Sequence, residues 1–110
     1  MNTHKIDPKR FKGKKLMRRQ TVPGTANDYD IRIDGLTVGR IVKKIESDLR
    51  VTWFWTMTAQ YYPQNSPQNG EEATFELARD AFNSMFREWL AWASKQSGKV
   101  TWNEVDNDST

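Results

Sequence analysis

Large apolar residues alternate with polar ones in two stretches of this chain, and such alternation predicts strands with one buried face. In residues 28–34, Tyr29, Ile31 and Ile33 alternate with charged side chains. In residues 49–60 the predicted inward side chains are Leu49, Val51, Trp53, Trp55 and Met57. Asp34-Gly35 predicts a hairpin after the first strand, because the glycine accepts the positive φ that such turns need. Glu46-Ser47-Asp48 predicts a second turn before the last strand.

A further strand is predicted between these turns, over residues 37–45, but its pattern leaves the inward face open. Either Val38 and Val42 point inward, or Ile41 and Ile45 do. We favour the second arrangement, which would place Arg40 and Lys44 outside. Gly39 predicts a bulge or the close approach of another side chain, with a tryptophan ring as the candidate.

Residues 75–93 repeat apolar positions with helical spacing. Thr74 is the best N-cap, although Asn69 would allow an earlier first turn, and Gly98 is the expected C-cap. One side of the helix carries Phe75, Ala78, Phe82, Met85, Phe86, Trp89, Leu90, Trp92 and Ala93. This stripe is wider than a surface helix needs, so part of it requires another cover: Val100 and Trp102, Phe11 or Leu16, or a second copy. The patterns together predict an α+β fold, a three-stranded antiparallel sheet packed against one C-terminal α-helix (β-β-β-α).

Charge is distributed unevenly along the 110 residues. Residues 1–20 hold eight cations and one carboxylate, a net charge of +7, whereas the remaining residues carry −4. The basic segment has few periodic apolar residues and includes Pro8 and Gly13, so we expect a disordered arm and linker over residues 1–27. The folded domain is then expected at 28–97, followed by an acidic tail at 98–110.

The basic arm predicts nucleic-acid binding. Cations that neutralise phosphates release bound counterions, and this release contributes affinity that does not depend on the nucleic-acid sequence. The alternatives are a solubilising tail or an arm folded onto the acidic domain. The candidate residues are Lys9, Arg10, Lys12, Lys14, Lys15, Arg18 and Arg19 in the arm, with Arg32, Arg40, Lys44, Arg50 and Phe54 on the outer sheet face. Phe54 is positioned to stack on a base; alternatively it lies beneath the polar loop at 61–70 or beneath the arm.

A module for binding proteins is the second functional hypothesis. The surplus helix surface around Leu77, Leu90 and Trp92 would contact a protein partner or form a homodimer. Its alternative is a cover supplied within the chain by Trp102.

Several residues resemble the pattern of small uncharacterised proteins of alphaproteobacteria. They are Tyr29-Asp30-Ile31, the segment from Gly35 to Ile41, Trp53-Phe54-Trp55, Gly70, Ala73-Thr74, Ala78 and Trp89. The resemblance covers about residues 28–92 and departs from the family pattern after Thr74. That family has no assigned biochemical role, so the resemblance supports the architecture and a bacterial source alone. The layout is also similar to AP2-type and integrase-arm DNA-binding domains, whose detailed sequence pattern this chain lacks.

Enzymatic function is not expected. The only histidine, His4, lies in the arm, and no nucleotide-binding glycine motif or zinc-ligand cluster appears. Asp28, Asp30 and Asp34 together would suit Mg²⁺, but Arg32 on the same face favours ion pairs instead. We therefore predict no cofactor and no metal. The absence of cysteine, of a signal-peptide pattern and of a long apolar run predicts a cytoplasmic protein without a membrane partner.

Overall fold

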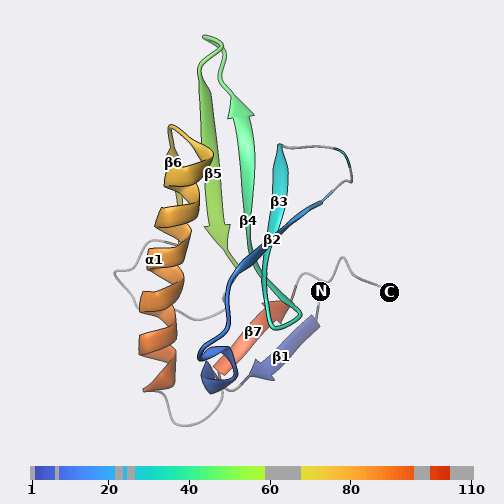
Figure 1. The fold of residues 1–110 in the computed structure, drawn as a ribbon, viewed down its shortest axis with the longest axis vertical. Coiled ribbons are helices and arrows are strands. Elements are labelled where there is room, and N and C mark those ends of the chain that lie inside the picture. Colours follow the sequence, from blue (N-terminus) through green and yellow to red (C-terminus); the bar gives the residue numbers. More distant parts are fainter. Residues whose placement is uncertain are drawn as a thin grey trace.

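The fold is a five-stranded antiparallel sheet with one helix packed along it (Figure 1). The computed structural model describes residues 2–6, 8–21, 24, 27–58, 68–95 and 100–104, with the backbone alone at 2–6, 8 and 100–104. The elements are β1 (Asn2–Ile6), the 3₁₀ helix η1 (Pro8–Phe11), β2 (Met17–Gln20), β3 (Asp28–Ile33), β4 (Leu36–Ile45), β5 (Val51–Met57), β6 (Asn69–Glu72), α1 (Phe75–Ser94) and β7 (Val100–Glu104). The sheet order is β2-β3-β4-β5-β6. The α+β class and the packed helix are confirmed, whereas the strand count of three is wrong.

Within this sheet, the two strands that the sequence missed are its two edges. β2 pairs with β3 from Met17 opposite Arg32 to Gln20 opposite Tyr29, and β6 pairs with β5 through Asn69–Glu72. Neither edge strand carries alternating apolar residues. Charged side chains on short edge strands discourage pairing with another chain, which explains why these strands lack the usual hydrophobic signal.

The β3–β4 hairpin forms at the predicted turn and contains a bulge. Asp34 and Gly35 have φ values of 50° and 80°, as a type I′ turn requires. The pairing shifts between Ile31 and Arg32, and this irregularity lets both Val38 and Ile41 reach the core. The prediction for Gly39 is confirmed in both forms, although the close ring is Phe82 rather than a tryptophan.

The third predicted strand, β5, is buried only in its C-terminal half. Trp55 and Met57 are buried and Trp53 is half-buried, as predicted for a strand beneath the helix. Ile45 and Leu49, in contrast, are 66% and 81% exposed, and Val51 is exposed too. These inward predictions are wrong because the β4–β5 hairpin projects past the start of α1, where no described element covers it (Figure 1).

Helix α1 begins where the sequence predicts. The Oγ1 of Thr74 accepts a hydrogen bond of 3.1 Å from the backbone amide of Leu77, which is the N-cap geometry. The core-facing positions of the helix are Ala78, Phe82, Phe86, Trp89 and Ala93. The C-terminal cap residue is Lys95, and the predicted cap Gly98 lies outside the described residues.

The two ends of the chain lie together. β1 and β7 form a separate two-stranded antiparallel sheet, with Asn2 opposite Glu104 and Ile6 opposite Val100, and β7 contacts β4. Part of the predicted acidic tail is therefore a strand; its pairing joins segments too distant for a local signal. The described part of the chain contains no helix with the length and apolar character needed to cross a bilayer.

Candidate nucleic-acid interface

Phe11 anchors the basic segment to the core. It is fully buried and lies edge-on to Phe86 of α1, with ring centroids 5.9 Å apart. Leu16 packs against the same core. Residues 8–20 thus form η1, a turn and the edge strand β2 where the sequence predicted a disordered arm. The two apolar residues give no periodic signal because they occupy a single turn and a loop, yet they supply the extra cover that the wide helix stripe required.

A second anchor is electrostatic. The Nε of Arg10 donates a 2.8 Å hydrogen bond to the Asp34 carboxylate in the β3–β4 turn, and the Nζ of Lys14 lies 3.6 Å from the same group. The hydrogen bond from Arg10 lowers the pKa of the Asp34 carboxyl, with a further contribution from the positive charge of Lys14. Two of the predicted phosphate-binding cations therefore hold η1 against the sheet.

Between η1 and α1 lies a groove of about 460 Å³ that we call the basic groove. Its walls are Lys9, Lys12 and Gly13 on one side and Arg87, Leu90 and Ser94 on the other. The helix residues recur at intervals of three and four, so they share one face of α1. Gly13, with φ of 76°, lets the chain turn back toward β2. η1 and the C-terminal half of α1 meet at one end of the molecule, opposite the β4–β5 hairpin (Figure 1).

The basic groove contains three cations and no carboxylate among its described lining residues. Lys9, Lys12 and Arg87 are all exposed, and neither Lys12 nor Arg87 forms an ion pair within the described part of the chain. Lys15 is also exposed and forms no ion pair with the residues that the structure describes. The negative end of α1 is also complemented by a cation of the helix itself, the C-cap residue Lys95. The sequence missed Arg87 because only the fold brings it near the basic segment.

The outer sheet face, which the sequence also predicted to bind phosphates, is neutralised by its own carboxylates. Both Asp28 oxygens accept hydrogen bonds from Arg40, and the one from Nε measures 2.7 Å. This contact raises the pKa of Arg40. The Nζ of Lys44 donates to Glu71 at 3.3 Å, and that hydrogen bond, followed by one from Thr52, lowers the pKa of Glu71.

The remaining predicted cations are also engaged. Arg19 pairs with the buried Asp30 at 3.3 Å, and Arg50 lies 4.0 Å from Asp48. Arg32 donates to the Thr37 hydroxyl and the Gly35 carbonyl. The guanidinium of Arg18 lies on the helix side of the sheet, 4.8 Å from the Tyr29 ring centroid and 4.9 Å from that of Phe75.

Phe54 is half-buried on the outer sheet face, with the Nζ of Lys44 5.8 Å from its ring centroid. The loop at 61–67, its alternative cover, lies outside the described residues. Asp28, Asp30 and Asp34 pair with Arg40, Arg19 and Arg10 respectively, and the described residues contain no group of carboxylates arranged for a metal ion.

The residues predicted to bind a protein are mostly part of the core. Leu90 and Trp92 are half-buried and packed against it, whereas Leu77 is 50% exposed. The larger apolar exposure lies on the β4–β5 hairpin, at Ile45, Leu49 and Val51. Val100 and Trp102, expected as covers, belong to β7, whose side chains are outside the description.

Comparison with known proteins found no family model, curated protein or solved structure that matches the chain. The resemblance to small alphaproteobacterial proteins stays a prediction.

Proposed function

We propose that the protein is a small non-enzymatic domain that binds the phosphate backbone of nucleic acid in the basic groove. The observation that carries this proposal is the convergence of Lys9, Lys12 and Arg87 on one groove with no carboxylate in its described lining. Clustered cations attract polyanions, and neither Lys12 nor Arg87 has a carboxylate partner within the described residues. The proposed contact is therefore the segment from η1 to Lys15 together with α1, rather than the ion-paired outer face.

The order of the basic segment supports the same conclusion. A free basic tail must lose conformational freedom when it binds, whereas cations held by a buried ring and an ion pair have lost part of it already. Phe11 and the Arg10–Asp34 pair supply these two anchors. Contacts made through phosphates alone give little sequence preference, so we expect duplexes of different sequence to bind alike.

Salt dependence tests the proposal. Three or four phosphate contacts predict that affinity for a labelled 20-base-pair duplex falls about 40- to 150-fold between 50 and 200 mM salt. The triple variant Lys9→Gln, Lys12→Gln, Arg87→Gln should flatten the slope of log K against log salt concentration by about three.

A matched control removes the same charge from the outer sheet face, through Arg40→Gln, Lys44→Gln and Arg50→Gln. We expect this control to keep most of the slope. Equal losses in the two triple variants would show a general charge effect, and a loss confined to the control would return the interface to the outer face. Either outcome would refute the basic groove.

Protein interaction is the second candidate, and exposure of the hairpin favours it. Leu49 combines an 81% exposed side chain with φ of 66°, a conformation that costs a residue with a side chain about 1 kcal/mol. We propose that this hairpin, rather than the helix surface at Leu90 and Trp92, pairs with a second copy. Sedimentation should then show a dimer that Leu49→Gly weakens without loss of thermal stability, since glycine relieves the backbone. A monomer at about millimolar concentration, the upper limit of a weak specific contact, would eliminate this candidate.

A further inference from the structure

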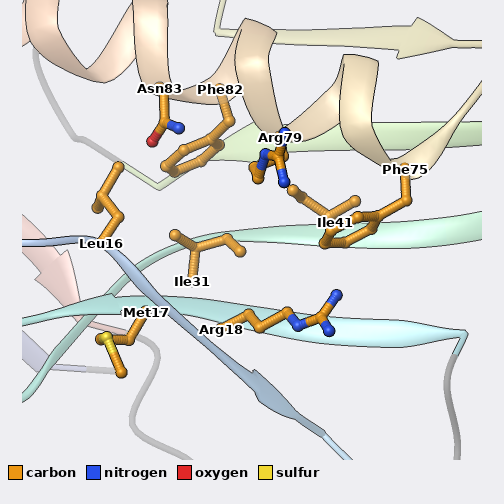
Figure 2. Close-up of a pocket in the computed structure, with 9 residues that line it drawn as sticks. All are labelled: Leu16, Met17, Arg18, Ile31, Ile41, Phe75, Arg79, Phe82 and Asn83. Atoms are coloured by element: carbon orange, nitrogen blue, oxygen red, sulfur yellow. The ribbon is translucent and has the colours of Figure 1, made fainter.

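A second cavity lies on the other side of the basic segment, between β2 and α1 (Figure 2). Its volume is about 140 Å³. Ile31 and Ile41 of the sheet and Phe82 of the helix form its apolar wall. Arg18 reaches it from β2, and Arg79 and Asn83 reach it from successive turns of α1.

We propose that this cavity binds a small organic carboxylate whose apolar body is the size of one aromatic ring. The volume supports that size, because a cavity of about 150 Å³ lined by aliphatic and aromatic side chains accommodates benzene. A larger ligand would have to displace Phe82 or the sheet residues, which are buried and packed.

The cations determine the charge of the ligand. Arg18 and Arg79 approach from two different elements, and planar guanidinium groups bind carboxylates through paired hydrogen bonds. The Tyr29 and Phe75 rings hold the Arg18 guanidinium beside the cavity at 4.8 and 4.9 Å. The lining of this cavity therefore combines an apolar wall with two arginines.

Arg79 is available to a ligand because its existing contact is weak. It reaches the carboxylate of the adjacent Asp80 at 3.2 Å, and both side chains are more than half exposed. Such exposed pairs contribute little free energy, so a ligand carboxylate can replace Asp80. Asn83 adds an amide that can donate a further hydrogen bond.

Titration of the ¹⁵N-labelled full chain with phenylacetate tests the proposal. We expect chemical-shift changes at Ile31, Ile41 and Phe82 and a Kd on the order of 1 mM, as suits a ligand of this size. The neutral analogue phenylacetamide should bind about fivefold more weakly, and acetate, which lacks the ring, should produce no shifts at these residues.

Arg79→Gln should weaken phenylacetate about fivefold and leave phenylacetamide unchanged, because it removes charge and little volume. Arg87→Gln is the matched control on the same helix, since it removes the same charge outside this cavity. Equal affinity for phenylacetate and phenylacetamide, equal effects of the two variants, or no shifts at the three wall residues would overturn the proposal.

This site is separate from the proposed function. Arg87→Gln should weaken the binding of duplex DNA without affecting the binding of phenylacetate, and Arg79→Gln should do the reverse. Failure of either proposal can therefore be recognised independently.

Discussion

Replacing Phe11 by alanine tests whether the basic segment is an integral part of the fold. The ring is fully buried against Phe86. A phenylalanine withdraws on the order of 150 Å² from water, which at about 25 cal/mol per Å² amounts to about 4 kcal/mol. Alanine retains a small part of this, so we expect Phe11→Ala to lower the free energy of unfolding by about 3 kcal/mol. For a domain of this size the midpoint of thermal unfolding should fall by about 12 °C.

Thermal unfolding followed by circular dichroism measures this loss, and amide hydrogen exchange locates it. Exchange should accelerate first at residues 9–20, because these lose their anchor. Phe54→Ala is the control: its ring is only half-buried, so less than half of the loss is expected. The reasoning fails if the free energy of unfolding of Phe11→Ala lies within about 0.5 kcal/mol of that of the unchanged protein, because a surface substitution has an effect of that size.

Three further substitutions test the local structure. Gly39→Ala should cost about 2–3 kcal/mol, because the added Cβ would lie 2.1 Å from the Phe82 ring and 2.6 Å from the Thr56 carbonyl oxygen; combined with Phe82→Ala its loss should be less than additive, and an unchanged denaturant midpoint contradicts this packing. Thr74→Ala should destabilise the protein by about 1 kcal/mol in denaturant unfolding, while Thr74→Ser keeps the cap; equal losses would dismiss the capping role. The Arg10 hydrogen bond lowers the pKa of Asp34, so its stabilisation is present above the unfolded-state pKa and is lost as pH falls through the folded value. Asp34→Asn should therefore reduce the loss of stability between about pH 5 and 3. An equal loss in the variant and in the unchanged protein would argue against this ion pair.

The elements that the sequence predicted are those with strong local signals. Alternating residues identified β3 and β5, the Asp34-Gly35 pair identified the β3–β4 hairpin, and Thr74 identified the helix start. The pattern could not show how far the helix cover extends. For that reason it placed Ile45 and Leu49 inward, although the hairpin passes beyond the helix.

The missing elements depend on distant parts of the chain. β2 and β6 are polar edge strands that form only against a completed sheet, and β1 pairs with β7 across most of the sequence. The candidate site has the same character. Lys9 and Lys12 were visible as part of a basic run, but Arg87 reaches them only because Phe11 docks on α1. Conversely, Arg40 and Lys44 have the charge to bind phosphate, but each is paired with a carboxylate that the sequence alone does not place beside it.

Charge reversal at Arg87 most directly tests whether the basic segment and the helix form one binding surface. Duplex affinity is measured by fluorescence anisotropy at about 100 mM salt, where a phosphate contact is not fully screened. Arg87→Glu should weaken binding about tenfold or more, whereas Arg79→Glu, the same change on the same helix outside the basic groove, should stay within about threefold. Equal losses in these two variants would mean that net charge rather than the basic groove determines binding, and the account of the basic groove would be contradicted.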